Sequence, residues 1–181
     1  MKIPELEAMP ASFVMARIEP GFQDLEYGYR MGLLGWKPVV EMSISIADRQ
    51  EKFSTALIDL ISVDKPQPGE VSRLLSEVAA SERPQAPAEL LSRRWLYLTM
   101  AWLYANRHNV SNPLETVDWV YAEFDYPEEV ASFVYYMPDD ATFDLPEHRD
   151  LAPIERLMRR WAHYLRMRSA EFGRPQAEAG S

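Results

Sequence analysis

The sequence predicts an all-α fold, either a helical bundle or a short solenoid-like stack of antiparallel helix hairpins, with about six to eight helices. Three observations support this prediction. Apolar residues recur at spacings of three and four along most of the chain, no segment alternates convincingly between apolar and polar residues, and proline and glycine interrupt the pattern. The length of 181 residues and the apolar share of 47% indicate a single domain, expected over residues 1–173, with a flexible tail over 174–181.

The first half of the chain is expected to form a series of short amphipathic helices. Residues 1–20 are compatible with a short helix capped by Ser12 and also with a strand. The polar run 48–52 either joins or separates two helical segments, and 64–69 (DKPQPG) forms a loop because proline and glycine cannot continue a helix. The apolar stripes are Phe22, Leu25 and Tyr29, then Val39, Met42 and Ile46, then Phe53, Leu57, Leu60 and Ile61, and then Val71, Leu74, Leu75 and Val78.

Residues 88–108 are expected to form the central core helix. Leu91, Trp95, Leu98 and Trp102 fall on one face, and further apolar residues make a second face. A helix that is apolar nearly all round is usually buried on several sides.

A helix start is predicted at residue 112. The Asn112 side chain can accept a hydrogen bond from a backbone N–H, Pro113 suits the first helical position, and Glu115 can reach back in a capping box. The expected buried stripe is Leu114, Val117, Tyr121 and Phe124.

A second helix start is predicted at Asp125. Asp125 would cap the helix, Pro127 would lie in its first turn, and Glu128 and Glu129 would favour the positive end of its dipole. The two helices are therefore expected to form an antiparallel hairpin with a turn at Asp125–Tyr126. The second stripe is Val130, Phe133, Val134 and Met137.

The chain is expected to continue with an acidic loop over 138–150 and a basic helix over 153–172. Phe143 and Leu145 are expected to turn inward from the loop. The apolar side of the helix would consist of Ile154, Leu157, Met158, Trp161, Leu165 and Phe172.

Charge is unevenly distributed along the chain. The net charge is −9, and residues 111–150 carry eleven acids against one base, Arg149. Residues 151–175 carry six arginines against two glutamates. Two interpretations stay open. Either the basic helix packs beside the acidic hairpin and neutralises it, or part of the acidic face stays open for a basic partner, whose association complementary charge would speed.

Composition argues against several function classes. A net charge of −9 disfavours nucleic acid and an anionic membrane surface as ligands, because phosphate binding needs a basic surface. The lack of cysteine removes disulfides, thiolate metal sites and cysteine nucleophiles. No stretch reaches about 18 apolar residues, and the first residues do not resemble a signal peptide, so a soluble, cytoplasmic protein is expected.

No catalytic or metal-binding motif stands out. His108, His148 and His163 show no HExxH or His–Asp spacing, and neither a GxSxG elbow nor a glycine-rich phosphate loop is present. The acids between Glu123 and Glu129 form the only dense group, and capping accounts for most of them. We therefore expect no enzyme activity, no cofactor and no metal.

The hairpin has aromatic residues that do not all fit its inward stripes. They either cover Phe143 or the basic helix, or form a protein-binding patch, for which exposed aromatics beside acids are typical. The predicted partner-binding residues are Trp119, Glu123, Tyr126, Glu129, Tyr135, Tyr136, Asp139 and Asp140.

The chain contains three distinctive segments: FQDLEYGYRMGLLGWKPVVEMSISIA, WLYLTMAWLYANR and NPLETVDWVYAEFDYPEEVASFVYYMP. Together they resemble an uncharacterised bacterial family classed as a domain of unknown function, whose most specific feature is Y-A-[ED]-F-D-Y-P-E-E. The resemblance covers roughly residues 10–140, leaves out the basic helix, and implies no activity and no catalytic residues.

Small acidic bacterial proteins of this kind are similar to immunity proteins encoded beside secreted toxins. This likeness implies an immunity protein that occludes a toxin, such as a basic toxin domain, through its acidic aromatic surface. The first alternative is a helical adaptor or regulatory homo-oligomer. The second is a carboxylate-based metal protein or enzyme.

Overall fold

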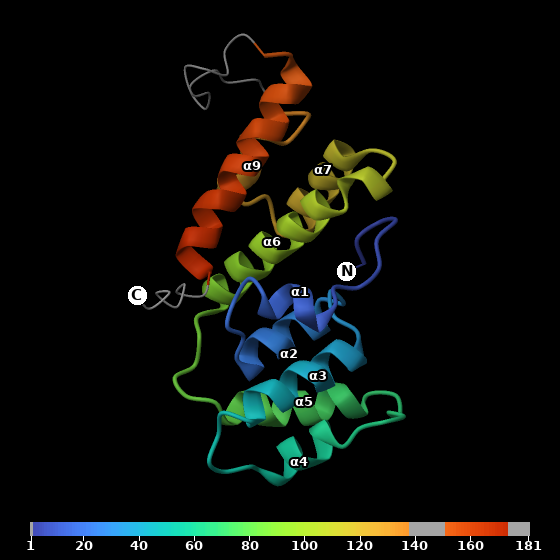
Figure 1. Cartoon of the computed structure of the whole chain (residues 1–181), viewed down its shortest axis with the longest axis vertical. Helices are drawn as coiled ribbons and strands as arrows, with labels where there is room; N and C mark the ends of the chain where they lie inside the picture. Colours follow the sequence, from blue (N-terminus) through green and yellow to red (C-terminus); the bar gives the residue numbers. More distant parts are fainter. Residues whose placement is uncertain (1, 138–150, 174–181) are drawn as a thin grey trace, which may run out of the picture. The chain divides into compact units, whose positions relative to one another are not determined.

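The computed structural model describes residues 2–137 and 151–173, and within these ranges it is all-helical with no strand (Figure 1). The predicted all-α class is therefore confirmed. The described residues form nine α-helices, whereas about six to eight were expected. The number is higher because α1 and α8 are separate helices of about one turn each, and because the segment after Gly35 forms two helices, α3 and α4. The helices are α1 (Ala11–Met15), α2 (Phe22–Arg30), α3 (Trp36–Ala47), α4 (Thr55–Ile61), α5 (Glu70–Ser81), α6 (Ala88–Ala105), α7 (Pro113–Glu123), α8 (Glu128–Ala131) and α9 (Pro153–Phe172), with a 3-10 helix η1 (Arg107–Asn109).

The chain divides into two compact units. Among the described residues, unit 1 contains Lys2 and Glu7–Trp95, and unit 2 contains Ile3–Leu6 and Leu96–Gly173. The boundary falls inside α6, so the first part of this helix belongs to unit 1 and the rest to unit 2. The single domain over 1–173 stays a prediction, and the expected flexible tail lies outside the described residues. In the part of the chain that is described, no helix is long and apolar enough to cross a membrane.

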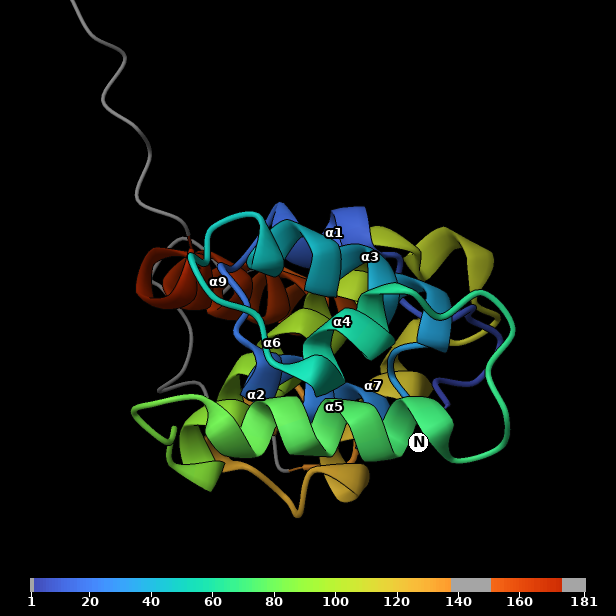
Figure 2. The same ribbon diagram turned by 90° about the horizontal axis from the view of Figure 1, so that it is seen from below.

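Helices α2 to α5 of unit 1 pack in a ring. α2 contacts α3 and α5, α4 contacts the same two helices, and α1 packs against α3. Figure 1 shows α3 and α5 between α2 and α4, and Figure 2 shows these helices from below. The predicted stripes line this core, since Leu25, Val39, Met42, Leu60 and Leu75 are fully buried.

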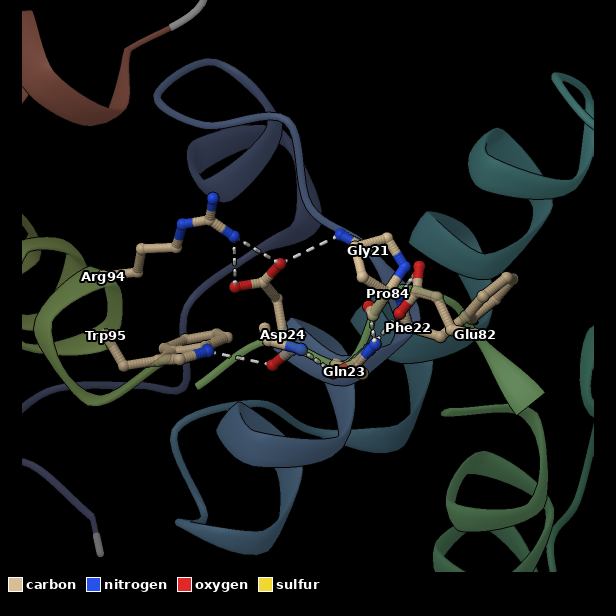
Figure 3. Close-up of polar contacts among 9 residues, drawn as sticks. Gly21, Phe22, Gln23, Asp24, Glu82, Pro84, Arg94 and Trp95 are labelled. Carbon is tan, nitrogen blue, oxygen red and sulfur yellow. Dashed lines mark hydrogen bonds and ion pairs between the residues drawn. The ribbon is translucent and has the colours of Figure 1, made fainter. Parts of the chain in front are cut away.

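A polar network holds the start of α2 to the loop that follows α5 (Figure 3). The Glu82 carboxylate accepts hydrogen bonds from the N–H groups of Phe22 at 3.2 Å and Gln23 at 2.9 Å. These N–H groups have no partner within the helix itself. The Gln23 side chain donates to the Pro84 carbonyl at 3.1 Å and accepts from the Ala86 N–H at 2.7 Å. A carboxylate at a helix N-terminus also interacts favourably with the helix dipole, so Glu82 stabilises α2 from outside it.

Asp24 connects the same helix start to α6. Its carboxylate accepts from the Gly21 N–H at 3.0 Å and forms an ion pair with Arg94 at 3.2 Å. Its main-chain carbonyl accepts a hydrogen bond from the Trp95 indole at 2.8 Å. Burial raises the pKa of the Asp24 carboxyl above its ordinary value, and the Gly21 N–H and Arg94 offset only part of that increase.

The Trp95 ring lies directly against Gly28. A Cβ added at Gly28 would lie 2.1 Å from a ring carbon, a distance that two such carbons cannot reach. Trp95 has no exposed surface. The glycine therefore lets a large aromatic side chain pack against the backbone of α2.

An aromatic cluster forms the core of unit 2. Trp161 is fully buried and stacks on Phe133, with ring centroids 6.1 Å apart and planes 7° apart. The Tyr104 ring meets Trp161 edge-on at 5.0 Å, and Tyr164 packs on Phe133 at 5.5 Å. Because Phe133 follows α8 and Trp161 lies on α9, this cluster holds the last helix against the hairpin, in agreement with the contact between α8 and α9.

Some expected positions differ in the structure. Ser12 lies inside α1, whose N-cap is Pro10, so the predicted capping role of Ser12 is wrong. Phe53 lies before the start of α4, Met137 lies beyond the end of α8, and Ile154 lies in the first turn of α9, and all three side chains are exposed. Apolar spacing does not show where a helix begins or ends, so residues near an end can match a stripe without packing in the core.

We expect Gly28→Ala to lower the free energy of unfolding by about 1–3 kcal/mol, because the new methyl group would overlap the Trp95 ring. Gly35→Ala is the matched control, since a Cβ there meets only the Pro38 Cδ at 3.8 Å. The control should change the free energy of unfolding by less than about 1 kcal/mol. Urea unfolding followed by tryptophan fluorescence measures both, and equal effects would contradict the proposed contact.

Asp24→Asn is expected to remove a pH-dependent contribution to stability. Because the pKa of Asp24 is raised in the folded state, this contribution is fully present at low pH and is lost as the pH rises through the folded pKa. The free energy of unfolding of the wild type minus that of the variant should therefore increase as the pH falls from about 7 toward about 4. Urea unfolding at a series of pH values gives this difference. A difference that shrinks on acidification would contradict the assignment.

Candidate functional site

The candidate site begins at the start of α7, where the predicted helix cap is confirmed. The Asn112 side-chain oxygen accepts from the Glu115 N–H at 3.3 Å, and Pro113 occupies the first helical position. The Asn112 side-chain amide donates to the Glu115 carboxylate at 3.1 Å. Just before this cap, the Glu5 carboxylate accepts from the Ser111 N–H at 3.2 Å and from its hydroxyl at 2.7 Å.

The other end of α7 is a Schellman motif. The Tyr126 N–H donates to the Tyr121 carbonyl at 2.9 Å, and the Asp125 N–H donates to the Ala122 carbonyl at 3.1 Å. This pair of hydrogen bonds defines the motif, which an apolar contact commonly accompanies. Here that contact is made by the rings of Tyr121 and Tyr126, which meet edge-on at 5.3 Å.

The predicted turn at Asp125–Tyr126 is confirmed, but the predicted role of Asp125 as a helix cap is wrong. The N-cap of α8 is Pro127, and no side chain bonds to the start of that helix. Asp125 and Tyr126 instead take the left-handed conformation that ends α7, with φ of 60° and 57°. Aspartate adopts this conformation more readily than most residues, whereas a bulky tyrosine does so rarely.

Three exposed tyrosines lie near this turn. The side chains of Tyr126, Tyr135 and Tyr136 are 59%, 62% and 56% exposed. The Tyr121 ring contacts Tyr126 and also lies 6.2 Å from the Tyr136 ring. The Tyr135 N–H donates to the Asp118 carboxylate at 2.8 Å. These five residues, Asp118 and the four tyrosines, form one connected surface that we call the tyrosine surface.

Two clefts share Asn112 and Glu115 at the start of α7. The first, which we call the α7 cleft, has a volume of about 310 Å³. Its lining residues are Asn112, Leu114, Glu115, Asp118, Tyr135 and Ile154. The second has a volume of about 270 Å³ and is lined by Pro4, Glu5, Ser111, Asn112, Glu115, Thr116 and Trp119. The α7 cleft thus combines carboxylates, an aromatic side chain and apolar side chains, and it shares Asp118 and Tyr135 with the tyrosine surface.

Two groups of the tyrosine surface have raised pKa values. Desolvation raises the pKa of the Asp118 carboxyl, the hydrogen bond from the Tyr135 N–H lowers it, and the charge of Glu115 raises it further. The pKa of the Tyr136 phenol is raised by desolvation and then by the neighbouring Tyr121, Tyr126 and Asp118. The Tyr136 phenol, like any tyrosine hydroxyl, can donate and accept a hydrogen bond.

The basic helix α9 neutralises one part of the acidic hairpin. Arg168 forms an ion pair with Glu129 at 3.0 Å, and the buried Arg160 donates to the Ser132 carbonyl at 2.9 Å. Another part of the hairpin keeps its charge open. The hairpin acids that form no ion pair within the described residues are Glu115, Asp118, Glu123, Asp125 and Glu128. Among all the residues that the structure describes, no group of three or more His, Cys, Asp or Glu side chains is arranged to hold a metal ion.

The structure brings together some of the predicted partner-binding residues and separates others. Tyr126, Tyr135 and Tyr136 share the tyrosine surface. Trp119 is half-buried in the second cleft, and Glu123 is exposed on α7. Glu129 is held by Arg168. The predicted site residues at positions 139 and 140, and the apolar residues expected to turn inward at 143 and 145, lie outside the described residues.

Six residues of the tyrosine surface and the α7 cleft were not among the predicted partner-binding residues: Asn112, Leu114, Glu115, Asp118, Tyr121 and Ile154. Asp118 follows Glu115 by three positions, and this spacing puts both on one side of a helix, a signal that could have identified the pair. Tyr121 belongs to the buried stripe and is buried, although its ring contacts two exposed tyrosines. Ile154 comes from α9, and no local pattern connects it with α7.

A family model described as "Uncharacterized protein conserved in bacteria (DUF2247)" matches residues 11–169. The match includes most of α9, which the resemblance seen in the sequence leaves out. The description names no activity, so it does not confirm the likeness to immunity proteins. Neither a curated protein nor a solved structure matches the chain.

The turn at the end of α7 allows a direct stability test. Asp125→Gly should raise the free energy of unfolding by about 0.5–1 kcal/mol, because glycine adopts a positive φ without a Cβ clash. Tyr126→Asn should change it by less than about 1 kcal/mol, since relief of backbone strain offsets the lost ring contact with Tyr121. Urea unfolding measures both variants. A loss of more than about 1 kcal/mol for Asp125→Gly would show that the aspartate side chain stabilises the turn.

Proposed function

Since the chain belongs to the DUF2247 family of uncharacterised bacterial proteins, we propose its function from its own surface: it is a protein-binding module. Its binding region is the tyrosine surface of unit 2 together with the open acids of α7 and α8. In its most concrete form, the proposal is that the protein is an immunity protein, which occludes a basic domain of a bacterial toxin.

The proposal rests mainly on two properties of Tyr126, the positive φ of its backbone and the exposure of its side chain. The residue has a φ of 57°, which costs an L-residue roughly 1–2 kcal/mol, and its side chain is 59% exposed. Glycine would adopt this φ without strain, and the ring contact with Tyr121 offsets part of the cost of the tyrosine, which leaves its exposed surface without a role in folding. Backbone strain of this kind clusters at binding and catalytic sites. An exposed aromatic anchor for a partner protein is a use that fits both observations.

The neighbouring tyrosines supply the chemistry that protein interfaces concentrate. Tyrosine is enriched among the residues that dominate binding energy, because it offers a large rigid contact area and a hydroxyl group. Tyr126, Tyr135 and Tyr136 each expose more than half of their side-chain surface, and Tyr121 connects two of them.

The negative charge of the acids on α7 favours a basic partner. Glu115 and Asp118 lie beside the tyrosines without a described ion-pair partner, and Glu123 is exposed on the same helix. Complementary charge would steer a basic surface onto this face and speed association. A toxin domain that presents a basic surface would be blocked by a protein bound there.

The test is co-expression with the product of the adjacent gene, followed by isothermal titration calorimetry of the purified pair. Tyr126→Ala combined with Tyr136→Ala should weaken binding by about 2–4 kcal/mol, because exposed tyrosines at an interface centre carry much of the binding energy. Phe53→Ala is the matched control, since Phe53 is an aromatic residue of unit 1 with 50% exposure and no part in the tyrosine surface.

Failure to form a tight complex would count against the immunity proposal, as would equal losses in the tyrosine variant and the Phe53 control. Size-exclusion chromatography with light scattering tests the alternative of a regulatory homo-oligomer. A stable dimer that dissociates in the tyrosine variant would favour that alternative.

A further inference from the structure

We infer that the α7 cleft receives an arginine side chain presented by the protein partner. The inference rests on the proposed function and deepens it by naming the chemical group that the site recognises. The cleft adjoins the tyrosine surface through Asp118 and Tyr135, so an arginine held there would set the orientation of a partner on the tyrosines.

The lining of the α7 cleft offers the contacts that a guanidinium group uses. Glu115 and Asp118 place two carboxylates at one cleft of about 310 Å³. Tyr135 contributes an aromatic side chain that is 62% exposed, and aromatic faces attract cations. Leu114 and Ile154 provide apolar surface for the aliphatic stem of a long cationic side chain.

Both carboxylates are oriented by uncharged donors. The Tyr135 N–H donates to Asp118 at 2.8 Å, and the Asn112 amide donates to Glu115 at 3.1 Å. Neither acid forms an ion pair within the described residues. Partial desolvation and the charge of Glu115 both raise the pKa of Asp118, and a cation in the cleft would offset both effects.

Arginine fits this arrangement better than lysine. Its planar guanidinium has five donors, so it can bond to two carboxylates while it stacks on an aromatic ring, whereas lysine acts as a compact point charge. A volume of about 310 Å³ is at the low end for whole small-molecule ligands and suits one side chain.

A second copy of the chain could offer exposed arginines of α9, such as Arg159 and Arg166, and the experiment below separates that case from a foreign partner.

The experiment is a titration of the full-length ¹⁵N-labelled protein with the peptide acetyl-Gly-Arg-Gly-amide, followed by amide chemical shifts. We expect saturable shifts at Glu115, Asp118 and Tyr135, because the Tyr135 N–H is bonded to the carboxylate that would bind the arginine. The same peptide with neutral citrulline in place of arginine should give no such shifts.

Asp118→Asn should weaken binding of the arginine peptide about tenfold, since it removes one charged acceptor. Asparagine keeps a side-chain oxygen for the Tyr135 N–H, so the fold of the cleft is retained. Asp59→Asn is the matched control: it makes the same change at an exposed acid of α4 in unit 1, which does not line the cleft, and it should leave the affinity unchanged.

Equal shifts with the citrulline peptide, or unchanged affinity in Asp118→Asn, would overturn the inference. A dimer in light scattering that Asp118→Asn dissociates would also overturn it, because the occupant would then be a second copy. The adjacent gene product could bind the wild type and Asp118→Asn equally and bind the double tyrosine variant weakly. That result would refute the arginine site and would leave the proposed function in place. If the arginine peptide binds as expected but no protein partner is found, the proposed function fails instead.

Discussion

Unit 1 depends on a carboxylate that caps a helix to which it does not belong. Glu82 is the C-cap residue of α5. Its carboxylate accepts hydrogen bonds from the first two N–H groups of α2, those of Phe22 and Gln23. Gly21 makes this approach possible, because a Cβ there would lie 2.6 Å from a Glu82 oxygen. The absence of a side chain at the N-cap position thus leaves room for a cap supplied by another helix. This cap adds to the packing of α2 against α5 and helps to align two helices that lie far apart in the sequence.

The same helix start also fixes the first part of α6. The buried carboxylate of Asp24 would be unfavourable without partners, and the Gly21 N–H and Arg94 supply them. One turn further along α2, the Trp95 ring packs against the backbone of Gly28. A polar contact and an aromatic contact therefore attach α6 to α2 within unit 1.

The sequence predicted features that depend on neighbouring residues and missed features that depend on distant ones. The helical stripes and the Asn112 cap were predictable because spacing and capping act over three or four residues. Glu82 is about 60 residues from the N–H groups it caps, so no local pattern could reveal it. Asp125 shows how a local signal can mislead. An acid before proline and two glutamates resembles a helix cap, but the hydrogen bonds of the Schellman motif and the Tyr121–Tyr126 ring contact assign it to the end of α7. The α7 cleft needs Ile154 from another helix, so only part of the site was visible in the sequence.

The buried carboxylate of Asp24 in unit 1 and the two carboxylates at the start of α7 in unit 2 have different kinds of partner, and this contrast agrees with the proposed binding role of unit 2. In unit 1, Asp24 is neutralised by Arg94, and Glu82 is used as a helix cap. In unit 2, within the described residues, Glu115 and Asp118 receive hydrogen bonds only from a neutral side-chain amide and a backbone N–H. Such donors hold a carboxylate in a defined orientation without removing its charge, and preorganised charge of this kind is what recognition of a cationic group requires. The strained and exposed Tyr126 lies at the other end of the same helix. The open charge and the strained backbone thus lie at the two ends of one helix, and the proposed interface with a basic protein would account for both.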